Sequence, residues 1–461
     1  MRLTSALVLS FALAAGVLAG GASNQATPPA GQTSQPASGQ DTVYKGEITG
    51  EPGAAPRYAV PDFLALSKDP EVAAAAKTIA EVLWDDLAFE REFYMIPRDT
   101  YSTIPAARSV MDVPFDRWRE LGADGLIIGS VERTATGLRV EVRLFNVRGG
   151  GTPVFGREYA GNAANPRFFA HTISDEIHQQ QRALPGVART KLTFSSDRDR
   201  ERLKGTIENR EVKEVYIADY DGANQRRVTT DRTLNITPTW APDGRAIAFT
   251  SYRRGFPDVL VSMIYQGRLE RPTAGRAQNW LPAWSPDGSK IAFTSNRDGN
   301  PELYVMNRDG SNVRRITQHP AIDTTPTWSP TGTQIAFTSD RTGSPAIYVV
   351  GEDGLNLRRI TTGGYCDRAT WSPAPYNELA YVCKQGPGYD IFLYNFANTS
   401  AVPITHGEGS NESPSFSPTG RHLAFTSTRA GKTHVFTVGR DGNGLRQVTK
   451  VGNNFTPDWS N

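Results

Sequence analysis

The sequence is short of the residues that most often carry out chemistry. It contains 2 cysteines and 6 histidines in 461 residues. It has no Gly-x-Ser-x-Gly turn for a serine nucleophile, no His-Glu-x-x-His zinc motif and no Gly-x-Gly-x-x-Gly dinucleotide motif. The histidines are scattered, and none belongs to a cluster with metal-ligand spacing. We therefore expect no catalytic residue, no metal site and no cofactor, and we place His171 and His178 at surface or helix-capping positions.

A strong net charge and long apolar stretches are also absent. The 50 basic and 48 acidic residues leave a net charge of +2, which provides no field for nucleic-acid binding. Beyond the N-terminus, no segment has 18 consecutive apolar residues, so we expect no direct membrane insertion. The balanced charge is compatible with a monomer.

The N-terminus has the pattern of a secretory signal peptide. Arg2 precedes an apolar run from Leu3 to Leu18, and small residues follow up to an expected cleavage after Ala22. The alternative is a membrane anchor, but the run is shorter than the ~20 residues of a spanning helix. No cysteine lies near the cleavage region, which argues against a lipoprotein. We assign residues 1–22 to the signal and residues 23–55 to a flexible, mostly uncharged linker and the segment that follows it.

Residues 56–185 mix strand and helix periods, which predicts a small α/β domain. Helices are expected at Asp69–Phe89, Pro114–Leu121 and Pro166–Arg182. The expected strands are Arg57–Phe63, Glu92–Pro97, Leu126–Ile128, Arg139–Phe145 and Val154–Tyr159.

A repeat of about 44 residues fills residues 187–461. A Pro-x-Trp motif, or a close variant, recurs at Trp240, Trp284, Trp328, Trp371, Phe416 and Trp459, with steps of 44, 44, 43, 45 and 43 residues. Each unit also carries an Ile-Ala-Phe-Thr-Ser strand, and its length suits one four-stranded blade of a β-propeller. The first copy lacks the Pro-x-Trp strand, and the last copy has only that strand. The sequence therefore predicts a multidomain chain in which six blades follow the α/β domain and the C-terminal strand closes the ring.

The repeat also explains several local patterns. We expect the Trp and Phe anchors to pack between neighbouring blades. The recurrent Asp-Gly pairs are more typical of tight turns than of calcium loops, and Gly431-Lys-Thr433 is expected in a hairpin turn rather than a phosphate loop. A charged insertion at residues 197–214 is expected to be a solvated loop, and a partner-docking loop is the alternative.

The two cysteines flank a predicted hairpin. If it is centred between Ala374 and Pro375, Cys366 and Cys383 lie about eight residues out on opposite strands and can face each other. Export to an oxidising compartment favours a disulfide. Two separate buried thiols are the alternative.

The segments before each Pro-x-Trp motif are equivalent and should converge on one face of the propeller. They are rich in Asn, Asp, Gln and Thr with a few aromatic residues, a composition that suits protein recognition. The alternative is that these polar side chains only satisfy turns. The candidate partner-binding residues are Asn235, Gln278, Asn279, Trp280, Asp323, Tyr365, Asp367, Asn411, Glu412, Asn453 and Asn454.

The strand-like Ala59-Val-Pro-Asp-Phe63, the Trp-Ser-Pro-Asp-Gly and Ile-Ala-Phe-Thr-Ser blade motifs and the signal peptide together resemble the TolB family. Members are periplasmic propeller proteins of the Tol–Pal envelope system. The resemblance implies a non-enzymatic adaptor that supports outer-membrane integrity and envelope constriction at cell division. It implies that the propeller face, with Gln278 and Asn279, binds the lipoprotein Pal.

The resemblance also implies a second partner. A segment within residues 41–49, with Val43, Tyr44 and Ile48, would bind the inner-membrane protein TolA. Family members begin with this segment near the mature terminus, whereas an uncharged linker precedes it here.

Two other functions compete with the adaptor. One is an exported sensor propeller that binds glycan or peptide without Tol partners. The other is an enzyme, which would need a peptidase domain after the propeller, although the sequence stops two residues after Trp459.

Overall fold

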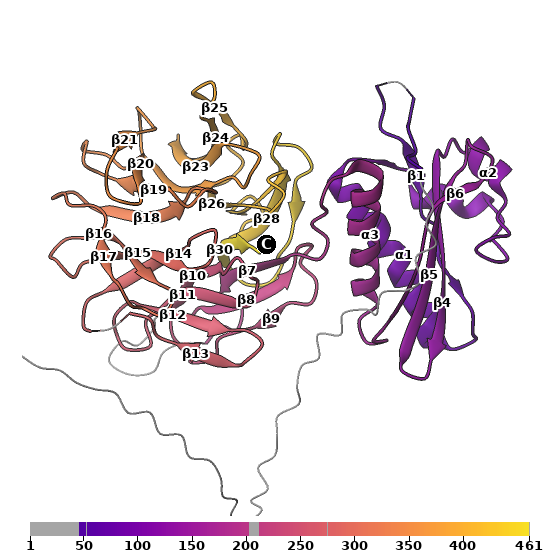
Figure 1. Ribbon diagram of the computed structural model, residues 1–461, viewed down its shortest axis with the longest axis horizontal. Helices are drawn as coiled ribbons and strands as arrows, with labels where there is room; N and C mark the ends of the chain where they lie inside the picture. Colours follow the sequence, from indigo (N-terminus) through magenta and orange to yellow (C-terminus); the bar gives the residue numbers. More distant parts are fainter. Residues whose placement is uncertain (1–45, 52, 202–211, 274, 461) are drawn as a thin grey trace, which may run out of the picture. The chain divides into compact units, whose positions relative to one another are not determined.

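The computed structural model describes residues 46–51, 53–201, 212–273 and 275–460. The expected signal peptide and the first part of the linker lie outside these residues. Within the described residues, no helix is both long and apolar enough to cross a membrane. The chain consists of an N-terminal α/β part and a six-bladed β-propeller (Figure 1).

The α/β part is built on one mixed sheet with the strand order β3-β1-β4-β5-β6, in which β2 also pairs with β4. β1 is parallel to β3 and β4, and β4, β5 and β6 are antiparallel. The strands are β1 (Arg57–Ala59), β2 (Leu64–Ala65), β3 (Tyr94–Met95), β4 (Gly125–Thr134), β5 (Gly137–Asn146) and β6 (Thr152–Gly161). The helices are α1 (Pro70–Glu90), the 3₁₀ helix η1 (Arg98–Thr103), α2 (Phe115–Glu120) and α3 (Pro166–Arg182).

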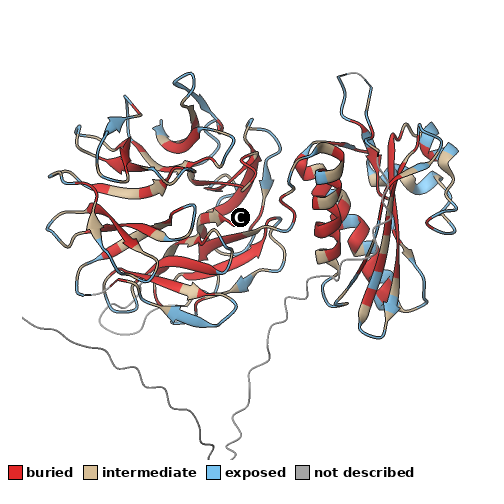
Figure 2. Cartoon of the chain, viewed as in Figure 1, coloured by how far each residue is buried: buried red, intermediate tan, exposed pale blue. Residues whose placement is uncertain are grey.

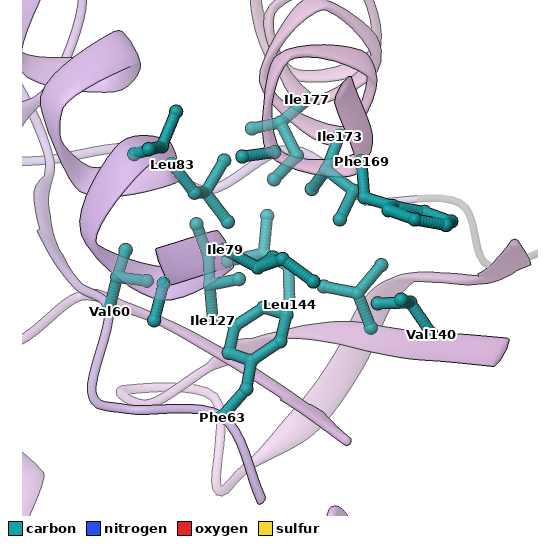
Figure 3. Packing of buried hydrophobic residues seen from close by; sticks show 14 of the residues in the cluster. Val60, Phe63, Ile79, Leu83, Ile127, Val140, Leu144, Phe169, Ile173 and Ile177 are labelled. Atoms are coloured by element: carbon teal, nitrogen blue, oxygen red, sulfur yellow. The ribbon is translucent and has the colours of Figure 1, made fainter. Parts of the chain in front are cut away.

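Helices α1 and α3 cover one face of this sheet. Asp69 caps α1 by accepting a hydrogen bond from the Glu71 amide at 2.9 Å, and Pro70 occupies the first turn. Apolar side chains of both helices meet those of the strands, as Ile79, Ile173 and Ile127 do (Figure 3). Alternate residues of β4, such as Leu126, point to a second cluster on the opposite face with Trp118 of α2. The sheet is therefore buried on both faces.

Two local predictions in this part need correction. The strand expected over residues 57–63 is shorter, because β1 ends at Ala59, two residues before Pro61, which cannot donate a ladder hydrogen bond; β2 begins only at Leu64, beyond the expected range. His171 and His178 are not surface residues, because both side chains are buried in α3. His171 Nδ1 lies 2.8 Å from the carboxylate of Asp86 in α1.

Each propeller blade is a four-stranded antiparallel sheet. Blade 1 contains β30 (Asn454–Trp459), β7 (Lys191–Ser196), β8 (Glu214–Asp219) and β9 (Arg226–Arg227). Blade 2 contains β10 (Asn235–Trp240), β11 (Ala246–Ser251), β12 (Asp258–Met263) and β13 (Arg268–Glu270). Blade 3 contains β14 (Asn279–Trp284), β15 (Lys290–Ser295), β16 (Glu302–Asn307) and β17 (Arg314–Arg315).

The remaining blades repeat the pattern. Blade 4 contains β18 (Asp323–Trp328), β19 (Gln334–Ser339), β20 (Ala346–Gly351) and β21 (Arg358–Arg359). Blade 5 contains β22 (Cys366–Trp371), β23 (Glu378–Gln385), β24 (Gly388–Asn395) and β25 (Ser400–Pro403). Blade 6 contains β26 (Asn411–Phe416), β27 (His422–Ser427), β28 (His434–Gly439) and β29 (Arg446–Gln447). The predicted closure by the C-terminal strand is confirmed, because β30 pairs with β7.

The aromatic anchors pack between blades as predicted. Trp284 of blade 3 lies in a cluster with Val261 and Met263 of blade 2, and Trp328 of blade 4 lies with Val305 of blade 3. The second and third strands of the blades are buried almost throughout, whereas exposed residues gather in the turns and outer strands (Figure 2). Asp-Gly pairs occupy turns, where Gly244 and Gly288 have φ of 65° and 69°.

Candidate functional site

The candidate site is the face of the propeller at which the six innermost strands begin, here called the entry face. β10 begins at Asn235 opposite Ser251, where β11 ends, so the turns that follow each second strand lie on the same face. The residue immediately before each innermost strand lies on this face. These six residues are Leu234, Gln278, Ile322, Tyr365, Ser410 and Asn453.

The first residue of each innermost strand is buried rather than presented on the face. Asn279 Oδ1 accepts a hydrogen bond from Arg297 at 3.0 Å, and Asn411 Oδ1 accepts one from Arg429 at 2.9 Å. Asp323 accepts from Arg341 at 2.8 Å. Asn235, Asn279, Asp323, Asn411 and Asn454 are all at most 1% exposed. These candidates therefore fix the starts of their strands inside the blades.

A second repeated motif in the sequence carries the signal for this role. The second strand of most blades ends in Ser, and Arg follows two residues later, as in Ser295 and Arg297. Arg297 Nε donates to the Ser295 hydroxyl at 3.1 Å while its Nη2 reaches the buried asparagine. An Asn or Asp at the start of one strand, followed by a Ser-x-Arg motif at the end of the next strand, is the sequence pattern that indicates this buried contact.

Blade 5 replaces this polar arrangement with a disulfide. Cys366 begins β22 and pairs across the ladder with Cys383, which takes the place of the strand-ending serine. The two are joined as a disulfide with a Cα–Cα distance of 4.1 Å. Where blades 1, 3, 4 and 6 use hydrogen bonds from an arginine, blade 5 therefore uses a covalent bond at the entry face.

Other candidates do reach the surface. Gln278 is exposed, Tyr365 is 36% exposed, and Trp280 is partly exposed. The Tyr365 ring stands edge-on to Tyr389 with a centroid distance of 5.7 Å. Ile322, at the equivalent position in blade 4, is 47% exposed and was missed as a candidate, although its alignment with Tyr365 in the repeat marks it. Blades 4 and 5 thus add apolar side chains to a mostly polar face.

The remaining candidates are half-buried and engaged with neighbours. Asp367 accepts a hydrogen bond from the Thr338 hydroxyl at 2.7 Å, and Glu412 accepts one from Ser410 at 2.9 Å. Asn453 donates through Nδ2 to Asp197 at 2.8 Å. These bonds order the loops and leave part of each side chain open to solvent.

A central channel opens between the innermost strands. It contains a cavity of about 160 Å³ and a second of about 350 Å³ that the Trp and Phe anchors line. One residue of each innermost strand bulges out of the ladder with positive φ next to the smaller cavity. These residues are Thr237, Leu281, Thr325, Arg368, Ser413 and Thr456. Non-glycine residues adopt this conformation at a cost, so the bulges are held by the surrounding sheet.

Asp458 is an acidic residue that lines both cavities. Burial raises its pKa to about 6, although the carboxylate accepts hydrogen bonds from the Trp240 amide at 2.7 Å and the Ser415 hydroxyl at 3.1 Å. The described residues contain no group of three or more His, Cys, Asp or Glu side chains arranged to hold a metal.

The expected N-terminal docking segment is only partly described. Val43 and Tyr44 lie outside the described residues. Ile48 is 1% exposed and belongs to the main cluster beneath α1 and α3. Its amide donates to Gln181 of α3 at 2.9 Å, and the same Gln181 side chain donates to the Gly46 carbonyl at 2.9 Å. Residues 46–48 are therefore held against helix α3.

Comparisons with known proteins agree with this architecture. The family model of the TolB amino-terminal domain matches residues 46–152, and that of the TolB beta propeller domain matches residues 185–375. The Tol-Pal system protein TolB of Desulfosudis oleivorans is 33% identical over 213 residues, 46% of either chain. That of Anaeromyxobacter dehalogenans is 35% identical over 196 residues, 42% of either chain. The matched part thus spans about half the length of these curated relatives.

A solved structure shares the fold over most of its length. The crystal structure of TolB from Acinetobacter baumannii superposes with a TM-score of 0.75 and 23% identity, covering 92% of this chain and 98% of that one. The combination of α/β part and propeller is thus common to both.

Proposed function

This chain belongs to the TolB family of Tol-Pal system proteins, and from that premise we propose that it acts in the periplasm as a non-enzymatic adaptor. The entry face would bind the peptidoglycan-associated lipoprotein Pal. The segment at residues 41–49 would bind TolA. Through these contacts the protein would support outer-membrane integrity and envelope constriction at cell division.

The composition of the entry face is the observation that carries the Pal proposal. In blades 3 and 4 an arginine holds the buried Asn or Asp that follows Gln278 and Ile322, and in blade 5 the disulfide follows Tyr365, so these three residues are presented on rigid supports. Half-buried polar groups such as Asp367 and Glu412 surround them. Aromatic and apolar anchors among adaptable hydrogen-bonding groups suit a protein partner, and preorganised loops lose little entropy on binding.

The TolA proposal assigns the contact with TolA to the residues before the buried Ile48. Ile48 is inside the core and Gly46 is tied to Gln181, so these residues would fix the start of the folded part. Val43 and Tyr44 would supply the contact itself.

Calorimetric titration of the purified chain with the soluble domain of the same organism's Pal-like lipoprotein tests the adaptor. We expect saturable one-to-one binding. The double change Gln278→Ala and Tyr365→Ala should weaken it at least tenfold, because truncated interface anchors commonly cost more than about 1.4 kcal/mol. The control is Leu355→Ala, a 63% exposed residue in the β20–β21 turn on the opposite side of its blade.

Each outcome of the titration is informative. Binding that the double change leaves intact would retain the adaptor and discard the entry face. No binding at ~100 µM would contradict the Pal assignment and favour an exported propeller that recognises a glycan or peptide.

A further inference from the structure

Blade 1 lacks the connection that holds the other five blades together at their inner edge. In blade 3, Ser285 and Lys290 flank a tight turn between the two innermost strands. The Ser285 amide donates to the Lys290 carbonyl at 3.0 Å, and the Lys290 amide donates to the Ser285 hydroxyl at 2.9 Å. A covalent hairpin thus joins β14 to β15.

Ser460 and Lys191 reproduce this arrangement without the covalent turn. The Ser460 amide donates to the Lys191 carbonyl at 2.8 Å, and the Lys191 amide donates to the Ser460 hydroxyl at 2.8 Å. The two residues are 269 positions apart in the sequence. At this end of strands β30 and β7, the two hydrogen bonds between Ser460 and Lys191 therefore stand where the other blades have a covalent hairpin turn.

The C-terminal end of helix α1 packs against this junction. Phe89 is 4% exposed and belongs to a cluster with Leu192 of β7 and Trp459 of β30. Its ring stacks on His422 at a centroid distance of 4.3 Å and stands edge-on to Tyr220 at 4.9 Å. One side chain thus contacts blade 1 and blade 6 at the point of closure.

Glu90, the next residue, secures the chain that enters β7. Its Oε1 accepts a hydrogen bond from the Val187 amide at 2.8 Å, and its Oε2 accepts one from Arg421 of blade 6 at 2.6 Å. Farther along, the Thr190 hydroxyl accepts a hydrogen bond from the Trp459 indole at 2.7 Å. The entering segment is therefore tied both to α1 and to the closing strand.

We propose that Phe89 and Glu90, here called the latch, replace the missing hairpin turn and keep the propeller closed. The α/β part is then a structural element of ring closure. The hydrogen bonds of a strand open locally when few packed side chains cover it. The latch provides this packing for β30, because Phe89 buries Trp459 at the end of the strand.

Hydrogen exchange of the full-length chain, read by mass spectrometry, tests the proposal. In Phe89→Ala we expect exchange in the peptides covering β30 and β7 to rise at least tenfold. The peptides covering β18 and β19 of blade 4 serve as the internal reference and should not change. Glu90→Gln keeps the side-chain volume and weakens the contact with Arg421, so it should raise exchange in the same two peptides by a smaller factor.

Phe169→Ala is the matched control, since Phe169 is buried like Phe89, at 2% exposed, but belongs to the core beneath α1 and α3. It should raise exchange in α3 and leave β30 unchanged. Unaltered exchange at β30 in both Phe89→Ala and Glu90→Gln would overturn the latch. So would an equal rise in all six blades. If Phe89→Ala does not fold, Glu90→Gln alone decides the question by the same comparison.

Discussion

Replacing Trp328 by alanine tests how the propeller is held together. Trp328 is 6% exposed, packs on Leu303 and Val305 of the preceding blade and donates its indole N–H to the Ala283 carbonyl at 3.2 Å. A buried tryptophan removes about 200 Å² from water, which corresponds to about 5 kcal/mol at ~25 cal/mol per Å². The unfolded chain already buries part of this surface, so we expect a loss of about 4 kcal/mol, as for other buried aromatic truncations.

Urea unfolding followed by far-UV circular dichroism measures the loss as a shift of the propeller transition. Trp280→Ala is the control, because Trp280 lies in the equivalent strand of the preceding blade but is only half-buried. Its truncation should cost about 1 kcal/mol or less. Equal costs for the two changes, or a cost below about 1 kcal/mol for Trp328→Ala, would refute the packing between blades as the source of stability.

Three further predictions follow from the blades and from the α/β part. Changing Cys366 and Cys383 together to serine should cost about 3 kcal/mol in urea unfolding, the loop entropy for a separation of 17 residues, and no loss would contradict a native disulfide. Arg341→Met strips the cation from a buried aspartate and should cost about 3–5 kcal/mol, whereas Arg297→Met, facing an asparagine, should cost about 1–2 kcal/mol; similar costs would show that the charge is irrelevant. For His171, burial favours the neutral ring, but the neighbouring carboxylates outweigh it and raise the pKa to about 9, so the protonated ring stabilises the fold fully below pH ~6.5 and loses that contribution as the pH rises through 9. His171→Gln should remove this pH dependence from the urea midpoint, and a difference from the wild type that is the same at pH 6 and pH 9 would disprove it.

The repeat made the propeller predictable, because its period fixes the blade length and its two incomplete ends fix the closure. The orientation of the polar side chains was harder to predict from the sequence. Asn235 and Asn279 look like surface groups in the sequence, since an asparagine before a strand is equally compatible with a loop and with a buried bond. Only the structure shows that Asn235 bonds to Glu214 of blade 1, whereas Asn279 bonds to Arg297 of its own blade.

Long-range partners account for the other differences. His171 is buried because Asp86, 85 residues earlier, offsets the cost of burying a charged ring. Ile48 is buried because Gln181, 133 residues later, satisfies its backbone. No local pattern around either residue contains its partner, so His171 was expected at a surface or helix-capping position, and the family resemblance placed Ile48 in a docking segment.

The arrangement at the start of each innermost strand separates two kinds of sequence constraint. The buried first residue, such as Asn279 or Asp323, is fixed by its arginine, whereas the residue before it, Gln278 or Ile322, contacts solvent. If the entry face binds Pal as proposed, adjacent positions encode folding and recognition independently. Drift at the second set can change what the face binds at little cost to the scaffold, which gives a propeller of this kind a route to follow an evolving partner one loop at a time.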